Sequence, residues 1–364
     1  MDQRSLQTRL LLCLHGMGTN TGLKRMNAAH NGISYRDLLY TRNRFINPDR
    51  LREAVRIVVN GTTACASDSK HFGAWDQNLM TKWHLRYGGP GIMVYWNVEK
   101  KSLCIYSQLK TTWSSEAASM IEGVLRHCSD MEVERQYVDS HGQSEVAFAF
   151  CRLLGFELLP RLKNIQSQRP YRPATGMGEA WPGLVPVLTR AIDWALIRQQ
   201  YDQMVKYATA LRLGTAQADD ILRRFTRSNV QHPTYRALSE LGKAVKTIFL
   251  CRYLHSEALR REIHEGLNVI EQWNGANGFI FFGRKGDFSS NRKEDQEESM
   301  LALHLLQNCL VYVNTLMVQR VLARPHWRGK LTAEDLRALT PLIWEHVNPY
   351  GTYTLDLDAR LALD

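Results

Sequence analysis

The chain has 364 residues, 44% of them hydrophobic and 23% charged; this composition excludes a disordered tail, and the length allows two or three structural units. Lys and Arg total 46 against 36 Asp and Glu, a formal net charge of +10, and such an excess favours a polyanionic partner, nucleic acid above all. A basic cytosolic enzyme without a nucleic-acid partner fits the composition equally well.

Three further features narrow the class of protein. The seven cysteines are scattered without a C-x-x-C pair, which favours buried thiols over a zinc site. The N-terminal apolar stretch is too short and irregular for a signal peptide. The longest apolar region, Leu301–Leu322, is interrupted by polar residues such as His304 and Asn314, and it predicts a core helix rather than a membrane span. We therefore expect a soluble, intracellular protein.

Residues 1–58 predict helices that are separated by the glycine-containing loop 15–25, HGMGTNTGLKR. This loop superficially resembles a phosphate-binding P-loop, which requires the pattern G-x-x-x-x-G-K-[ST]. Because Leu23 stands between Gly22 and Lys24, the pattern fails. The sequence therefore argues against an ATPase.

The periodicity of the chain changes from Thr62 onward. Apolar runs rich in Val, Ile and Tyr predict strands at 63–72, 88–98 and 102–110. The segment 114–127 begins with serines followed by a glutamate, which is an N-cap signature, and continues with helical spacing. The chain thus forms three strands before it returns to a helix.

Strand and helix then alternate. A strand is predicted at 132–142, a helix at 144–155 that Gly155 closes, and a short extended piece at 156–165. Three adjacent strands followed by this alternation imply an α/β fold, in which a mixed sheet carries helices on its faces.

Two aspartates lie on strands of this predicted sheet. Asp68 is on the first strand and Asp139 ends the fourth, 71 positions later (139 − 68). Active sites of such sheets gather at the ends of neighbouring strands, so both carboxylates reach one end of the sheet if these two strands are neighbours. A single Asp at a strand end more often caps a turn. The pair, rather than either residue alone, carries the prediction.

A third carboxylate is expected on a later helix. The helix predicted at Ser256–Asn274 has an apolar stripe formed by Leu259, Ile263, Leu267 and Ile270. Glu271 falls on the edge of this stripe, whereas Glu262 and Glu265 are expected to face solvent. The rivals Glu297 and Glu298 lie in the first turn of the last long helix, where acidic residues complement the helix dipole.

Carboxylates in this arrangement suit phosphodiester chemistry. Two Mg²⁺ ions about 3.5–4 Å apart activate the attacking oxygen and neutralise the leaving one, and Mg²⁺ prefers oxygen ligands. We therefore predict Asp68, Asp139 and Glu271 as catalytic and metal-binding residues, with Mg²⁺ as the cofactor and Mn²⁺ as its substitute.

The rest of the chain begins with a basic segment and is then predicted to be largely helical. Residues 161–178 contain no acidic residue, helices are predicted over about 181–274 and 293–346, and 350–364 is expected to be a surface tail. The candidate contacts to the DNA backbone are Arg161, Lys163, Arg169, Arg172, Arg223, Arg224 and Arg227. For each of them, an ordinary solvated surface residue is the alternative.

Four segments of the chain carry a resemblance to a known family. They are LLLCLHGMGTNTGLKR at 10–25, YVDSHGQSEVAFAFCRLLGFELLPRLKNI at 137–165, LRREIHEGLNVIEQWNGAN at 259–277 and LALHLLQNCLVYVNTLMVQRVL at 301–322. They closely resemble the C-terminal catalytic region of Tn3-family transposases, and the resemblance covers almost the whole chain. It implies a ribonuclease-H-like DDE fold with a mixed sheet, a helical insertion and flanking helices.

The resemblance also implies an activity and partners. Asp68, Asp139 and Glu271 would be the DDE residues. The activity would be Mg²⁺-dependent cleavage at the 3′ ends of a transposon, followed by strand transfer into target DNA in replicative transposition. The partners would be transposon ends and target DNA, with a homodimer or a full-length transposase as a further partner and no membrane. The protein would act in the bacterial cytoplasm, at the nucleoid.

A five-part organisation follows from the resemblance and the predicted elements. We expect a helical N-terminal segment at 1–58, the first part of the ribonuclease-H-like core at 59–180, a helical insertion at 181–255, the completion of the core with the Glu271 helix at 256–290, and a C-terminal helical region at 291–364. The interval of 132 residues between Asp139 and Glu271 (271 − 139) fits an inserted helical unit.

Transposases of this family are far longer and carry N-terminal modules that recognise the terminal inverted repeats. We therefore expect a truncated form that keeps the fold and metal binding but recognises transposon ends poorly. Two alternatives remain. One is a metal-dependent nuclease without strand transfer. The other is a catalytically silent remnant that binds DNA or inhibits an intact transposase.

Overall fold

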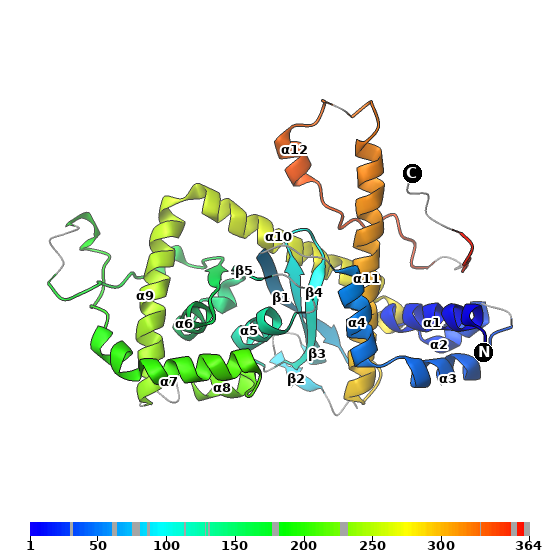
Figure 1. The fold of residues 1–364 in the computed structure, drawn as a ribbon, viewed down its shortest axis with the longest axis horizontal. Coiled ribbons are helices and arrows are strands. Elements are labelled where there is room, and N and C mark those ends of the chain that lie inside the picture. The colour runs from blue at the N-terminus through cyan, green and yellow to red at the C-terminus, as the bar shows by residue number, and fades with distance from the viewer. Residues whose placement is uncertain are drawn as a thin grey trace.

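A mixed β-sheet forms the centre of the molecule, and helices flank it on both sides (Figure 1). The computed structural model describes residues 1–29, 32–59, 64–74, 81–85, 88–112, 114–127, 129, 132–176, 182–225, 232–327, 329–350 and 355–359. The strands are β1 (Ala64–Gly73), β2 (Lys82–His84), β3 (Gly89–Glu99), β4 (Cys104–Thr111), β5 (Arg135–Val138) and β6 (Glu157–Pro160). The five predicted strands are therefore present, and the short β2 is an addition.

The helices precede, interrupt and follow the sheet. They are α1 (Gln3–Gly18), α2 (Leu23–Ala29), α3 (Tyr35–Phe45), α4 (Pro48–Val58), α5 (Glu116–Arg126), α6 (Glu145–Leu154), α7 (Trp194–Leu213), α8 (Ala218–Arg224), α9 (Pro233–His255), α10 (Glu257–Ile280), α11 (Lys293–Leu322) and α12 (Ala333–Ala338). In Figure 1, α1–α4 and α11 lie on one side of the sheet and α6–α9 on the other.

The strand order is β2-β3-β1-β5-β6, with β4 also paired to β3. Strand β1 is antiparallel to β3 and parallel to β5, and β5 is parallel to β6. A parallel pair needs a long crossover connection, and between β1 and β5 this connection contains β2, β3, β4 and α5. The mixed sheet with helices on its faces confirms the predicted ribonuclease-H-like α/β fold class.

Helices α5 and α10 cover opposite faces of the sheet. On β3, the Trp96 ring packs against Trp273 of α10, with ring centroids 6.0 Å apart. The next residue, Asn97, points the other way, because successive strand residues alternate between faces, and its side chain abuts Gly123 of α5. Trp96 and Asn97 are both fully buried. The centre of the sheet is therefore dry on both sides.

Local capping explains where α5 and α6 begin and end. The side chains of Ser115 and Ser144 accept hydrogen bonds from the third residues of α5 and α6, Ala118 and Ala147, which satisfies amide groups that a helix start leaves unpaired. Helix α6 ends at Gly155, whose φ of 93° is left-handed and favours glycine. The predicted serine N-cap of α5 and the predicted stop of α6 at Gly155 are confirmed.

The N-terminal helices pack on α11, and here the predicted loop 15–25 is wrong. Helix α1 continues to Gly18, so only 19–22 separate it from α2. Gly16 and Gly18 lie within α1 and serve packing, whereas Gly22 lies in the short turn with a left-handed φ of 82°. A Cβ at Gly18 would lie 2.9 Å from the carbonyl oxygen of Ala302 on α11, so only a residue without a side chain allows this close contact.

The helices of the other side begin later than predicted, and the C-terminal block ends earlier. Of the predicted stretch 181–274, residues 182–193 are not α-helical, and α7 starts only at Trp194. Of the predicted block 293–346, α11 ends at Leu322 and only the short α12 follows. Prolines at 182, 186 and 325 explain both differences, because proline removes a backbone donor and opposes a continuous helix.

Helix α11 is the one helix of the described ranges that is long and apolar enough to cross a membrane. Half of its most apolar window is buried in the fold. The buried part carries polar side chains with partners in the core. His304 lies 2.8 Å from both Ser107 Oγ and the Cys104 carbonyl oxygen of β4, and Asn308 Nδ2 donates to that carbonyl at 2.9 Å. These contacts agree with a core helix.

Candidate functional site

Asp68 and Asp139 lie where the parallel pairing of β1 with β5 ends. Ser67 is the last residue of β1 paired with β5, and its partner is Val138. The two aspartates are the next residues of these neighbouring parallel strands. Both line a small pocket that also includes Glu116 of α5 and Gly142. The strand neighbourhood on which the predicted pair depended is therefore confirmed.

The environment of Asp68 disfavours its charge. Burial raises the pKa of the Asp68 carboxyl to about 6, and the negative charges of nearby acidic residues add to this effect. These residues are Glu116, Asp139 and Glu271. A hydrogen bond from the Ser69 backbone opposes the rise. The pocket therefore has an excess of negative charge, which a bound cation would neutralise.

Hydrogen bonds connect helix α10 to β1 next to Asp68. Asn274 Nδ2 donates a hydrogen bond to Asp68 Oδ2 at 3.2 Å. Lys70 Nζ donates to the Asn274 carbonyl oxygen, and burial lowers the pKa of this lysine to about 8. Asn274 thus contacts β1 through both its side chain and its backbone. The neighbouring Trp273 is fully buried and belongs to the core rather than to a groove.

Glu271 lies on α10 and faces Asp139 across an arginine. Its side chain is 55% exposed, and its Oε1 is 3.3 Å from Arg161 Nη1. The same guanidinium lies 3.2 Å from Asp139 Oδ1 through its Nη2. The apolar stripe behind Glu271 is buried as predicted. The guanidinium of Arg161 thus contacts both Asp139 and Glu271. The charges of these two carboxylates also act on Asp68.

Glu116 is an acidic residue of this pocket that the sequence prediction missed. It lies in the first turn of α5, lines the pocket with Asp68 and Asp139, and accepts a hydrogen bond from Ser69 Oγ at 3.3 Å. In the sequence, Glu116 was explained by helix capping alone. Its position in the chain, at the start of the helix between the two aspartate strands, is the signal that could have identified it.

The donor set suits a hard divalent cation, since all four acidic side chains offer carboxylate oxygens. Within the described residues, however, no three His, Cys, Asp or Glu side chains converge closely enough to hold a metal ion. Between Asp139 and Glu271 lies the guanidinium of Arg161. The chemistry of the site therefore fits Mg²⁺ or Mn²⁺, and its side chains would have to close around the ion.

One expectation about α10 is wrong. Glu262 was expected to face solvent, but its Oε1 accepts hydrogen bonds from Tyr137 Oη and Arg135 Nη1, both at 2.6 Å. The buried Tyr137 ring ends at a phenol group that needs a polar partner, and Glu262 supplies it. Both side chains line a hollow of about 1080 Å³ between α10, α11 and α12. Asp68, Asp139 and Glu271 do not line this hollow.

Glu297 and Glu298 of α11, the alternatives to Glu271, form ion pairs with the N-terminal helices. Glu298 Oε2 pairs with Arg42 of α3 at 2.8 Å, and Glu297 pairs with Arg52 of α4. These ion pairs attach the N-terminal helices to α11. The preference for Glu271 over Glu297 and Glu298 agrees with these contacts, although a catalytic role for Glu271 stays a prediction.

The predicted DNA contacts fall into three groups. Arg161 is paired within the site, and Arg172 lies further along the same segment, where its backbone bridges to Ala191. Lys163 and Arg169 are exposed on the loop that follows β6. Arg223 and Arg224 are exposed at the end of α8. Arg227 lies outside the described residues.

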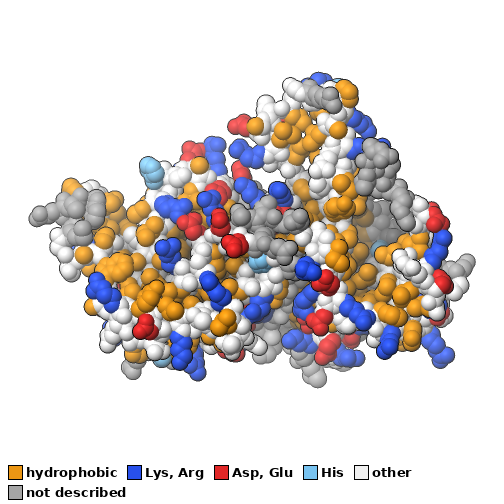
Figure 2. Space-filling model, viewed as in Figure 1, with side chains coloured by type: hydrophobic (Ala, Val, Ile, Leu, Met, Phe, Trp, Pro, Cys, Tyr) orange, Lys and Arg blue, Asp and Glu red, His pale blue; other side chains and the backbone are white. Residues whose placement is uncertain are grey.

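The surface gives no uniform basic face in the view of Figure 2. Acidic and basic side chains are interspersed there, and hydrophobic side chains gather over α12 and the adjoining part of α11. Tyr312 and Met317 of α11 and Leu336 of α12 are among the exposed residues of this region. The net charge of +10 is therefore not concentrated on this face.

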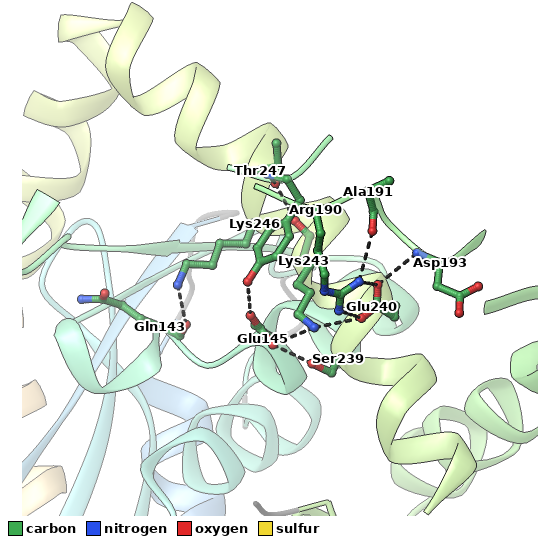
Figure 3. A network of polar contacts seen from close by, with 11 residues as sticks. Gln143, Glu145, Arg190, Ala191, Asp193, Ser239, Glu240, Lys243, Lys246 and Thr247 are labelled. Atoms are coloured by element: carbon green, nitrogen blue, oxygen red, sulfur yellow. Dashed lines mark hydrogen bonds and ion pairs between the residues drawn. The ribbon is translucent and has the colours of Figure 1, made fainter. Parts of the chain in front are cut away.

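A polar network holds the loop after β6 against α6 and α9 (Figure 3). At its centre, the almost fully buried Glu240 of α9 pairs with Arg190 and with Lys243, the latter at 2.8 Å. Burial by itself would raise the pKa of Glu240, but the hydrogen bonds of these two cations and of the Asp193 backbone outweigh it and lower the pKa to about 2.

The network extends to the segment that follows Asp139. Glu145, in the first turn of α6, accepts hydrogen bonds from Tyr171 Oη at 3.1 Å and Ser239 Oγ at 2.6 Å. Lys246 Nζ donates to the Gln143 carbonyl oxygen at 3.4 Å. Helix α9 is thereby connected to the turn that carries Asp139.

Comparison with known proteins identifies what the chain is similar to. The model of the Tn3 transposase DDE domain matches residues 1–353. The transposase for transposon Tn1546 of Enterococcus faecium is 28% identical over 98% of this chain and 37% of its own length. The transposase for transposon Tn501 of Pseudomonas aeruginosa shows the same identity and the same shares.

A third relative matches a smaller part. The transposase for transposon gamma-delta of Escherichia coli K12 is 29% identical over 65% of this chain and 24% of its own length. The chain thus spans about 37% of the length of the first two relatives.

Proposed function

Since this chain belongs to the Tn3 transposase DDE family, we propose that it forms the catalytic region of a transposase, which cleaves transposon 3′ ends and transfers them into target DNA. The observation that supports this proposal most directly is that Asp68 in the middle of β1 and Asp139 directly after β5 follow paired residues of neighbouring parallel strands, with Glu116 and Glu271 nearby. DDE domains generally use divalent cations. We propose Asp68, Asp139 and Glu271 as the ligands and Glu116 as a fourth acidic residue of the site.

Each residue has a role that follows from its surroundings. Asp68 is held in the β1–β3 ladder, and Asp139 directly follows Val138, the last residue of β5 paired with β1, so the two would present their carboxylate oxygens at a spacing that the sheet limits. Glu271 is exposed on α10 and is free to adjust its rotamer towards a shared ion. When bound, the divalent cations would supply activation of the attacking oxygen and charge stabilisation at the phosphate.

The exposed cations near the site suit the DNA backbone. Lys163 and Arg169 lie on the loop that follows β6, close in sequence to Arg161, and each would add a salt-sensitive phosphate contact. Arg223 and Arg224 are the more distant candidates on α8. The proposed partners are transposon ends and target DNA, and the proposed place of action is the bacterial nucleoid.

The joining step can be tested by itself. A labelled duplex that ends in a free 3′-hydroxyl, a supercoiled target plasmid and Mg²⁺ or Mn²⁺ are mixed with the full chain. We expect joined products that depend on the cation and disappear in Asp139→Ala. Glu116→Gln should reduce joining by roughly 10- to 100-fold, the range seen when groups that support metal ligands are removed.

The matched control is Glu122→Gln on the same helix, where Glu122 pairs with Arg126 four residues later, and its joining should stay at the parental level. Cleavage without joining would instead indicate a metal-dependent nuclease. DNA binding that is unaffected by Asp139→Ala, with neither cleavage nor joining, would indicate a silent remnant and contradict the proposal.

A further inference from the structure

We propose that Arg161 balances the charges of Asp139 and Glu271 in the cation-free protein and must release both carboxylates before a divalent cation binds. This inference rests on the proposed function, because it concerns the same site. It gives Arg161 a role as a positioning residue within the site, in place of the DNA-backbone contact predicted from the sequence.

The contacts of the guanidinium carry the inference. Arg161 Nε and Nη2 lie 3.3 and 3.2 Å from Asp139 Oδ1, and Nη1 lies 3.3 Å from Glu271 Oε1. Two carboxylates from different elements, the end of β5 and the middle of α10, are thus connected by one side chain. An arginine stays charged at any physiological pH, so it compensates both carboxylates without a metal ion.

The backbone of Arg161 is fixed while its side chain is not. Its amide donates to the Val138 carbonyl oxygen at 2.9 Å, which extends the β5–β6 ladder. Its carbonyl oxygen accepts a hydrogen bond from Gln143 Nε2 at 3.1 Å. The side chain is 41% exposed. The guanidinium can therefore rotate away from the two carboxylates into solvent without disturbing the strand that anchors it.

Competition for the same oxygens follows from this geometry. A divalent cation would bind the carboxylate oxygens that now accept hydrogen bonds from the guanidinium. The permanent positive charge of the guanidinium also repels a metal cation that approaches the site. This explains why the acidic side chains of the described residues are close together without forming a ready metal cluster.

The test is a calorimetric Mn²⁺ titration of the full chain without DNA. Removal of a competing cation should tighten binding, so we expect the dissociation constant of Arg161→Gln to fall by roughly three- to tenfold, the scale of a partly exposed ion pair. Arg252→Gln is the matched control, because Arg252 pairs with Glu157 at the start of the neighbouring strand. Its Mn²⁺ affinity should equal that of the parent.

A purely structural role for Arg161 predicts the opposite sign. If Arg161→Gln binds Mn²⁺ as weakly as the parent or more weakly, the inference is overturned. Arg161→Lys provides a second variant, because its single ammonium cannot span both carboxylates, and it should also bind more tightly than the parent. The loss of Mn²⁺ binding in Asp139→Ala reports on the proposed function separately. A parent chain that binds no Mn²⁺ would overturn both.

Discussion

The position of Asp68 in the fold makes its ionised form energetically unfavourable. Its carboxyl is partly buried and surrounded by acidic neighbours, and burial raises its pKa to about 6. In the unfolded chain the same carboxyl has its ordinary pKa of about 3.9. The folded protein therefore binds this proton more tightly than the unfolded chain does. The stability that this provides is full below about pH 4 and is lost as the pH rises through 6.

Asp68→Asn should therefore stabilise the metal-free protein at pH 7–8. We expect a gain of about 1–2 kcal/mol, which is less than the full pKa shift would give because Asp68 retains some solvent access. Urea unfolding in the presence of a chelator at pH 4.5 and pH 8 measures it, and the gain should shrink at the lower pH. Asp49→Asn, at a side chain 99% exposed, is the control. A loss of stability at pH 8 would contradict this account.

Individual site residues were predictable to different degrees. The neighbourhood of Asp68 and Asp139 could be predicted because their two strands are visible in the sequence, whereas their catalytic role stays a prediction. Glu116 was missed, because a glutamate in the first turn of a helix was explained by capping and its position between the two aspartate strands was not considered. Arg161 was predicted as a DNA contact, because its pairing with Asp139 and Glu271 depends on three segments that meet only in the folded chain.

At the level of elements, α10 positions Glu271 by packing closely on β5. Gly266 lies over the Tyr137 ring, and a Cβ there would come within 2.5 Å of Tyr137 Cδ2. The ring cannot yield, because Tyr137 is buried and its phenol is bound to Glu262 at 2.6 Å. The glycine therefore sets the distance between the helix and the sheet.

Gly266→Ala should move α10 away from β5 and destabilise the fold by about 1–3 kcal/mol, the range typical of overpacking. Thermal unfolding measures the loss. The control is Gly275→Ala on the same helix, where an added Cβ meets only the edge of the Trp344 ring at 3.3 Å, and we expect a smaller change. Equal effects of the two substitutions would show that helix propensity, rather than the contact with Tyr137, decides the outcome.

The order of strands and helices was largely predictable, because local signals such as Ser144 and Gly155 mark where elements begin and end. The exceptions have tertiary causes. Gly18 continues α1 since α11 lies against it, and Glu262 turns inwards because Tyr137 requires an acceptor. Neither partner lies near these residues in the sequence. Hydrophobic periodicity therefore could not reveal them.

At the scale of the whole molecule, the Glu240 network connects α9 to the segment before α7, to α6 and to the turn after β5 (Figure 3). Close packing accompanies it, since a Cβ at Gly242 of α9 would lie 1.8 Å from the Glu145 carbonyl oxygen of α6. The position of α9 relative to the turn after Asp139 is therefore set by both backbone contact and paired charges. The predicted five-part division of the chain stays a prediction.

Glu240→Ala should weaken this connection and cost about 2–3 kcal/mol, because it removes the closer acidic partner of the largely buried Lys243 ammonium and leaves it the longer contact with Glu145 at 4.0 Å. The folded-state pKa of Glu240 is lowered to about 2, so the stabilisation is present above about pH 4.5 and lost as the pH falls towards 2. Unfolding at pH 7 and pH 3 measures both effects.

The control for this prediction is Arg252→Ala, which breaks the exposed pair with Glu157 and should change stability by less than about 0.5 kcal/mol. If Glu240→Ala lowered the stability at pH 7 by no more than Arg252→Ala does, the network would contribute no more to stability than an exposed ion pair.

The register of β1 and β5 also has a genetic consequence. The distance between Asp68 and Asp139 is set by backbone hydrogen bonds, which most substitutions leave intact. One extra codon between Cys65 and Asp68 would turn the aspartate to the opposite face. We therefore expect an insertion or deletion in this strand to disrupt the proposed site more often than a substitution does. Many substitutions separate this chain from the Tn1546 relative, which is 28% identical over 98% of this chain, and we expect the register of β1 and β5 to tolerate such substitutions better than an inserted residue.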